Sequence, residues 1–133
     1  MRIGEAARRA GTTTRALRFY ESQGLLDADR SANGYREYDD RDVRVVVEIR
    51  SLQAEGLSLE ETRPFVECLR AGNDASDSCA DSLEMYSRKL AEVDAQIARL
   101  QAIRAALLTR QAVAAARDVV GCRAPFGIGG PNT

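Results

Sequence analysis

The sequence of 133 residues contains no histidine and no tryptophan, and it has only three cysteines, three phenylalanines and four tyrosines. Without histidine the chain has no Ser-His or Cys-His pair, no imidazole acid or base, and no imidazole metal ligand. Most hydrolase mechanisms are therefore excluded, and we expect no enzyme. So few aromatic side chains would leave the core of a monomer thin, which favours an oligomer.

Long hydrophobic runs and a strong net charge are also missing. The longest aliphatic cluster is the VVV at residues 45–47, so no signal peptide or membrane span is expected. An odd number of cysteines without an export signal indicates free or metal-bound thiols in a reducing cytoplasm. The net charge of -1 gives no general attraction to nucleic acid, but residues 1–38 hold seven Arg and five acidic side chains. Any nucleic-acid contact should therefore come from this local excess of +2.

The N-terminal block reads as a helix pair followed by a β-hairpin. Residues 3–10 are Ala-rich, Gly11 interrupts them, and residues 12–14, all Thr, offer N-caps for a second short helix. Asn33-Gly34 predicts a hairpin turn, and residues 35–38 alternate like a strand. The pattern predicts a helix-turn-helix with a wing.

Two more helices are predicted before residue 72. Asp39 or Asp40 can cap a helix whose apolar residues between 43 and 52, including Val47, fall mostly on one face. Ser58 and Glu61 match a capping box at the start of the next helix. Pro64 predicts that this helix is kinked or restarts near Phe65.

Residues 79–117 contain no Pro and no Gly and predict one long helix with a narrow apolar stripe. We call this stripe the seam; its side chains are Leu83, Tyr86, Leu90, Val93, Ile97, Leu100 and Leu107. A helix of about 58 Å, at ~1.5 Å per residue, cannot bury such a stripe against a small domain, so a second copy is expected to cover it. The expected domains are residues 1–72, residues 73–117 as linker and dimerisation helix, and residues 118–133 as effector loop and flexible tail.

Several side chains on the helix pair and the wing suit DNA. Guanidinium groups contact phosphates and guanine edges, and hydroxyl groups bind phosphates. A solvated basic face is the alternative for any two arginines, but the combination with a helix pair and a wing favours DNA binding. Leu17 and Phe19 are expected in the core. The candidate DNA contacts are Thr13, Arg15, Arg18, Tyr20, Arg36 and Tyr38.

The motifs RFYE at 18–21, GLL at 24–26 and NGYREY at 33–38 resemble the N-terminal domain of the MerR family of bacterial transcriptional regulators. The likeness continues more weakly to residue 117. It implies a mainly α fold, with a winged helix-turn-helix DNA-binding domain and a long C-terminal antiparallel coiled-coil dimerisation helix. It further implies a homodimer on a palindromic promoter operator, which distorts DNA in response to an effector so that RNA polymerase can start.

The three cysteines are Cys68, Cys79 and Cys122. Cys68 lies on an apolar stretch and is expected to be a small buried hydrophobe. Cys79 begins the long helix, where metal-responsive members of the family carry a cysteine, and the implied antiparallel dimer would bring Cys122 of the other chain beside it. Two thiolates suit a soft cation such as Hg(II) or Cu(I), whereas zinc needs further ligands. Those relatives usually place another cysteine where this chain has only Ala and Val, at 112–116.

Other readings stay open. Three cysteines cannot supply a four-thiolate iron-sulfur cluster, but a reversible thiol switch is compatible with them. An apolar effector could bind near Phe65, Leu69 and Tyr86. A rival of another class is a coiled-coil adaptor whose N-terminal fold binds protein, and it would lack the steep salt dependence of DNA binding.

Overall fold

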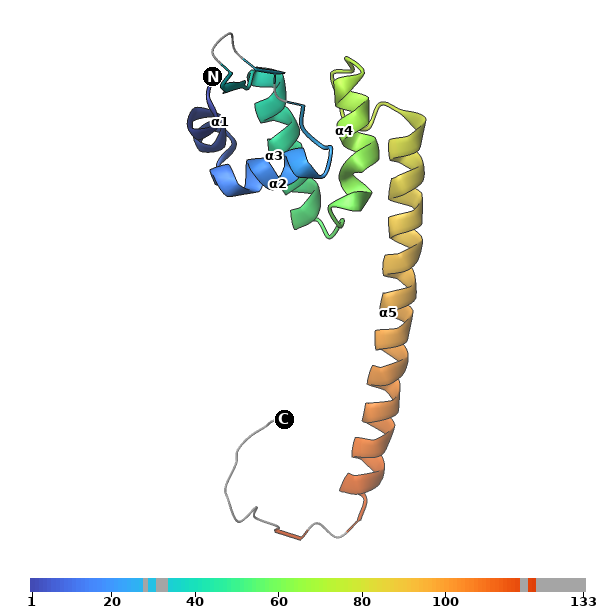
Figure 1. Cartoon of the computed structure of the whole chain (residues 1–133). Helices are drawn as coiled ribbons and strands as arrows, with labels where there is room; N and C mark the ends of the chain where they lie inside the picture. Colours follow the sequence, from blue (N-terminus) through green and yellow to red (C-terminus); the bar gives the residue numbers. More distant parts are fainter. Residues whose placement is uncertain (28, 31–33, 118–119, 122–133) are drawn as a thin grey trace. The chain divides into compact units, whose positions relative to one another are not determined.

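The computed structural model describes residues 1–27, 29–30, 34–117 and 120–121. The first unit of the chain, Met1–Ala91, is called the head below, and the second is Glu92–Thr133. In Figure 1 the head is built from short helices and a small hairpin, as expected for a mainly α chain. The elements are α1 (Ile3–Ala10), α2 (Thr14–Ser22), β1 (Asp29–Arg30), β2 (Arg36–Glu37), α3 (Asp40–Ala54), the 3-10 turn η1 (Glu60–Thr62), α4 (Arg63–Arg70) and α5 (Ala80–Ala115).

The helix-turn-helix forms where the sequence predicts it. α1 stops at Gly11, whose φ of 71° is left-handed and whose N–H bonds the carbonyl of Arg8 at 3.1 Å. Among the three threonines, Thr13 is the N-cap of α2, because its hydroxyl oxygen accepts a hydrogen bond from the N–H of Ala16 at 3.1 Å. Only three residues separate the two helices, which sets α2 at a sharp angle to α1.

The wing consists of β1 and β2, which pair antiparallel with Asp29 opposite Glu37. Gly34 has a φ of +87°, as a tight hairpin turn requires, whereas Asn33 lies outside the described residues. The strand is shorter than predicted because Tyr38 leaves the hairpin ladder. Its N–H donates a hydrogen bond to the carbonyl oxygen of Met1 at 2.7 Å, so the first residue of the chain is held beside the end of β2.

The predicted cap of α3 and the predicted capping box at Ser58 are both confirmed, and the cap of α3 is itself a capping box. Asp39 caps α3, since its carboxylate accepts the N–H of Asp42 at 3.0 Å and the Asp42 carboxylate accepts the N–H of Asp39 at 3.0 Å. The hydrogen bond from the Asp42 N–H also holds the pKa of Asp39 below its usual range. Ser58 and Glu61 exchange hydrogen bonds in the same way. The Ser58 N–H donates to the Glu61 carboxylate at 2.8 Å, and the Glu61 N–H donates to the Ser58 hydroxyl oxygen at 3.2 Å.

Pro64 marks a new helix, as predicted. η1 ends at Thr62 and α4 begins at Arg63, so Pro64 lies in the first turn of α4, where a missing backbone N–H costs nothing. Phe65 and Val66 follow it into the core.

Two packed clusters form the core of the head. Val47, expected on the apolar face of α3, is exposed, because Val45, Val46 and Ile49 already occupy that face. The larger cluster contains Ala6, Ala7, Ala10, Leu17, Tyr20, Leu25, Leu26, Tyr38, Val45, Val46, Ile49, Val66 and Leu69, and the smaller one Leu52, Leu57, Phe65 and Met85.

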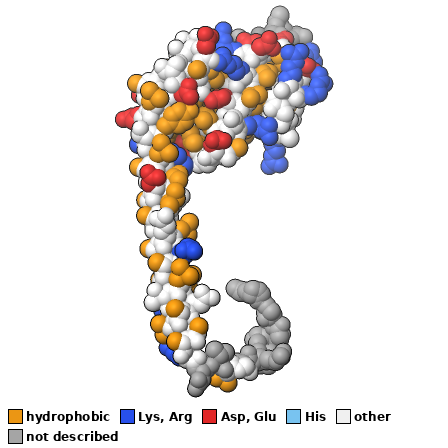
Figure 2. Space-filling view, turned by 180° about the vertical axis from the view of Figure 1, so that it is seen from behind, with side chains coloured by type: hydrophobic (Ala, Val, Ile, Leu, Met, Phe, Trp, Pro, Cys, Tyr) orange, Lys and Arg blue, Asp and Glu red, His pale blue; other side chains and the backbone are white. Residues whose placement is uncertain are grey.

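α5 has 36 residues and a length of about 54 Å at ~1.5 Å per residue. Apolar side chains lie along it in Figure 2, and six of the seven seam residues are exposed in the single chain: Leu83, Leu90, Val93, Ile97, Leu100 and Leu107. Pairing of α5 with a second copy stays a prediction, as do the boundaries at residues 72 and 117. Within the described ranges, no helix is long and apolar enough to cross a membrane.

Tyr86, a predicted seam residue, makes contacts within the head. Its ring packs on Phe65 with centroids 5.0 Å apart, and its hydroxyl donates to the Asp77 carboxylate at 3.0 Å. Burial, followed by the hydrogen bond to Asp77, raises the pKa of Tyr86. The first turns of α5 cover the smaller core cluster, so the partly buried Tyr86 has contacts inside the head, and its place in a dimer interface stays a prediction.

Candidate nucleic-acid interface

α2 presents one polar face to the outside of the head. Arg15 and Arg18, three residues apart, are exposed, whereas Leu17 and Tyr20 are buried on the opposite face. Thr13, also exposed, holds the N-terminus of this helix through its cap. The predicted arginine pair therefore shares one accessible surface, which is the geometry that a recognition helix needs in a major groove.

Phe19 was expected in the core, and this prediction is wrong. Its side chain is 51% exposed, because it follows Arg15 by four residues and so lies on the same face of the helix. An exposed aromatic ring beside the arginine pair offers apolar contact to a thymine methyl group or a sugar. The spacing from Arg15 was the signal in the sequence that could have found it.

A shallow hollow joins α2, the wing and the start of the chain. It has a volume of about 280 Å³, and we call it the basic hollow; its lining residues are Arg2, Ile3, Arg18, Gly34, Tyr35 and Arg36. The predicted contacts Arg18 and Arg36, which lie 18 positions apart in the sequence, are thus brought to one surface. Basic side chains gather at this end of the head in Figure 2, and those that line the hollow are arginines. Three guanidinium groups around one opening suit a phosphate.

Arg2 and Tyr35 are members of the basic hollow that the sequence analysis missed. The Arg2 guanidinium lies 4.0 Å above the centre of the Tyr35 ring, a cation–π contact that fixes both side chains. Tyr35 is 53% exposed. Strand alternation places Tyr35 and Tyr38 on opposite faces of the wing, and this alternation was the available signal.

Arg36 is tied to the recognition helix. Its guanidinium pairs with the Glu21 carboxylate at 3.1 Å, and both side chains are partly exposed. A partly exposed pair of this kind contributes little to stability, but it orients the wing relative to α2. Arg36 therefore has a positioning contact in addition to its predicted contact with DNA.

The expected contacts of Tyr38 and Tyr20 with DNA are corrected by their burial. Tyr38 is only 2% exposed, and its hydroxyl donates to the Glu21 carboxylate at 3.4 Å. Burial, followed by the negative charge of Glu21, raises the pKa of Tyr38. Tyr20 is buried as well. Both rings complete the core of a head that has few other aromatic side chains.

Replacing Tyr38 with Phe tests this assignment. The ring stays in the core and only one weak hydrogen bond is lost, so we expect the free energy of unfolding to fall by about 1 kcal/mol and the affinity for DNA to stay within about twofold. Urea unfolding and fluorescence anisotropy with labelled DNA measure the two quantities. A tenfold loss of affinity at unchanged stability would show instead that the hydroxyl group reaches DNA.

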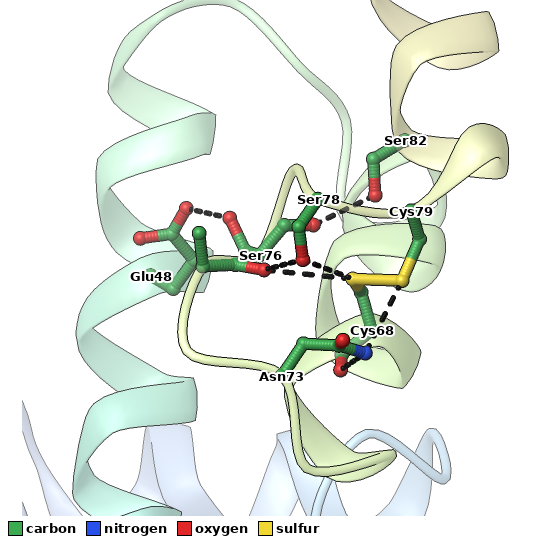
Figure 3. The surroundings of a disulfide bond; sticks show 8 residues. Glu48, Cys68, Asn73, Ser76, Ser78, Cys79 and Ser82 are labelled. Atoms are coloured by element: carbon green, nitrogen blue, oxygen red, sulfur yellow. Dashed lines mark hydrogen bonds between the residues drawn. A yellow bond between two sulfur atoms is a disulfide. The ribbon is translucent and has the colours of Figure 1, made fainter.

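The cysteines are arranged differently from the prediction. Cys68 and Cys79 form a disulfide whose Cα atoms are 5.9 Å apart, at the end of α4 and just before α5 (Figure 3). Cys68 is buried as expected, at 3% exposure, but it is no inert hydrophobe. Cys122 lies outside the described residues. Among the side chains that are described, no three of Cys, Asp and Glu converge as metal ligands would.

The segment around the disulfide is bonded to the rest of the head. The Ser76 hydroxyl donates to the Glu48 carboxylate of α3 at 2.5 Å, and the Ser82 hydroxyl donates to the carbonyl of Ser76 at 2.7 Å. Ser76 and Ser82 are buried. Residues 72–78, expected as a polar linker, are thus bonded through Ser76 to α3 and to the beginning of α5.

Comparison with known families gives two overlapping matches. Residues 1–67 match the family described as "MerR HTH family regulatory protein", and residues 43–110 match the one described as "MerR, DNA binding". The transcriptional regulator HmrR of Rhizobium leguminosarum bv. viciae is 35% identical over 107 residues, which cover 80% of this chain and 81% of HmrR. CueR of Salmonella typhi is 32% identical over 123 residues, 92% of this chain and 87% of CueR.

Two solved structures are also similar. PbrR691 from Ralstonia metallidurans CH34, solved in complex with lead(II), is 29% identical with a TM-score of 0.68, and the match covers 92% of this chain and 94% of PbrR691. HiNmlR, a MerR family regulator lacking the sensor domain and bound to promoter DNA, is 29% identical with a TM-score of 0.53, over 77% of this chain and 76% of HiNmlR.

Proposed function

Because the chain belongs to the MerR family of DNA-binding transcriptional regulators, we propose that it works as a homodimer on a palindromic promoter operator. Its effector would change the shape of the bound DNA and so the access of RNA polymerase, in the cytoplasm. One observation carries the proposal: three arginines line the basic hollow, one from the N-cap of α1, one from α2 and one from the wing. This surface suits DNA, whereas a coiled-coil adaptor protein would not require it.

Each part of the interface would have its own task. Arg15 and Arg18 would read base edges in the major groove, where guanidinium groups bind guanine O6 and N7. Arg2 and Arg36 would bind phosphates, which set the register of the protein on DNA. Phe19 would add an apolar contact beside the arginine pair.

A second copy of the chain would cover the exposed part of the seam. Its six exposed side chains follow one stripe of α5, and a helix of this length buries such a stripe most simply against its own copy. Two heads related by two-fold symmetry match a palindrome when their recognition helices lie about 34 Å apart or a multiple of it. A small change in the angle between the heads would then bend or untwist the promoter.

For the effector, we propose a thiophilic cation held by Cys79 of one subunit and Cys122 of the other. The similar structure of PbrR691 with lead(II) and the place of Cys79 before α5 support this. The donors fit a soft two-coordinate ion only while Cys79 is not bonded to Cys68. The ion, when bound, would link two thiolates of different subunits. The apolar-effector alternative has less support, because the rings of Phe65 and Tyr86 pack against each other where that ligand would lie.

Selection from a pool of genomic promoter fragments tests the DNA-binding proposal. We expect the dimer to retain fragments with an inverted repeat. The logarithm of their affinity should fall linearly with the logarithm of salt concentration, with a slope of about -0.9 per phosphate neutralised. Failure to retain any fragment at low salt would refute it and favour the adaptor.

A further inference from the structure

We propose that Cys68 and Cys79 form a reversible dithiol–disulfide pair, and that its oxidation withdraws Cys79 from effector binding. The pairing itself rests only on the geometry of the head, whereas the competition rests also on the proposed function. A Cα separation of 5.9 Å lies within the range that a disulfide spans without movement of the backbone. Cys68 lies near the end of α4 and Cys79 directly before α5, so two helices fix the positions of the pair.

A DNA-binding protein works where glutathione and thioredoxin keep thiols reduced. A disulfide in that compartment forms transiently, in response to an oxidant, and is reduced again afterwards. The resting form is therefore the dithiol, which leaves Cys79 free for a cation. Oxidised and reduced forms would be two regulatory states of the same head.

A hydroperoxide would be the oxidant. The Cys79 thiolate attacks the terminal oxygen, the O–O bond breaks, and an alcohol leaves while Cys79 becomes a sulfenic acid. Cys68 then attacks the sulfur of Cys79, the S–S bond forms, and water leaves with the proton of the Cys68 thiol. Two thiols thus lose two protons and two electrons to one peroxide bond.

The surroundings of the two sulfurs distinguish their roles. Cys79 is partly exposed and Cys68 is almost completely buried, so an oxidant reaches Cys79 first. The Asn73 side-chain amide donates to the Cys79 sulfur at 3.4 Å, so a polar donor faces the more exposed of the two sulfurs. The Ser78 hydroxyl lies 3.6 Å from the Cys68 sulfur (Figure 3). Cys79 is therefore the attacking thiol and Cys68 the one that resolves the sulfenic acid.

The disulfide also closes a covalent ring of residues 68–79, which include the segment between α4 and α5. Ser76 lies within this ring and holds Glu48 of α3, and its carbonyl accepts the hydroxyl of Ser82 from α5. Oxidation thus restrains the connection between the DNA-binding helices and α5 at the same time as it occupies the sulfur of Cys79. The oxidant and the cation would thus both act on residues 68–79, which connect α4 with α5.

Thiol mapping of the full-length protein tests the pair. The reduced protein is treated with cumene hydroperoxide, alkylated, digested and analysed by mass spectrometry. We expect a peptide pair linked through Cys68 and Cys79 that dithiothreitol separates, with Cys122 still alkylated. In Cys68→Ser, and in Cys68→Ala as a check on folding, dimedone should trap the sulfenic acid on Cys79. Alkylation of both cysteines after oxidation, or a link from Cys79 to Cys122, would overturn the pair.

Titration with Hg(II), followed by the ultraviolet absorption of the mercury–thiolate bond, tests the competition. The reduced dimer should bind the ion, the oxidised dimer should not, and dithiothreitol should restore binding. Cys122→Ser should still form the disulfide. Because the reduced Cys68–Cys79 pair can itself chelate Hg(II), Cys122 is tested in a Cys68→Ser background, where Cys68→Ser alone should keep the two-thiolate absorption and Cys68→Ser with Cys122→Ser should lose it. Equal binding before and after oxidation would overturn the competition. A reduced dimer that binds no Hg(II) would refute both the competition and the proposed effector site. The Cys68–Cys79 pair is tested separately by the thiol mapping.

Discussion

Replacing Leu90 and Ile97 with Asp should leave the protein monomeric and lower its operator affinity to the level of non-specific binding. Both side chains are exposed in the single chain and lie on the stripe that a second copy would cover. Burial of each new carboxylate costs several kcal/mol, and a dimer would bury four of them. Sedimentation velocity measures the oligomeric state, and anisotropy with operator DNA measures the affinity.

The matched control places the same charges on the opposite side of α5. Ala95 and Ala102 are exposed and lie away from the seam, so Ala95→Asp with Ala102→Asp adds the same charge at a similar loss of helix propensity. This control should remain a dimer. A stable dimer of the Leu90 and Ile97 variant would reject the seam as the interface, whereas monomers of both variants would indicate that added charge alone separates the chains.

Replacing Arg18 with Ala should weaken operator binding by about 1 to 3 kcal/mol, and it should relax the preference at one base position if the contact to guanine is bidentate. Arg18 is exposed on α2 and also lines the basic hollow, so its guanidinium can reach a base edge beside the wing. Arg36→Ala should instead weaken binding to all DNA sequences alike. It should also reduce the slope of log affinity against log salt concentration by about 1. Binding to a set of single-base operator variants over a range of salt concentrations separates the two effects.

Arg99→Ala on α5 provides the control for loss of one positive charge. Arg99 lies outside the head, so its removal should leave affinity and base preference unchanged. If Arg36→Ala relaxed a base preference while Arg18→Ala weakened all operators uniformly, the proposed docking of α2 in the major groove would be reversed.

Residues that act within a few positions of themselves in the sequence were sufficient to predict where the helices begin and end. Gly11, Thr13 and Asp39 act through hydrogen bonds or backbone angles within a few residues, so their environment in the fold is already present in the sequence. Pro64 likewise starts α4 because its ring is tolerated only in a first turn. The motifs of the helix pair and the wing were also specific enough to indicate the family.

The tertiary structure alone decided which side of each element is covered. Periodicity shows that residues share a face, but the face that becomes buried depends on elements that are distant in the sequence. Phe19 is therefore exposed and Tyr38 buried, contrary to expectation, and Tyr86 packs on α4 although it fits the heptads. Cys68 and Cys79 meet for the same reason: the turn after α4 brings the chain back, and no local pattern specifies that return.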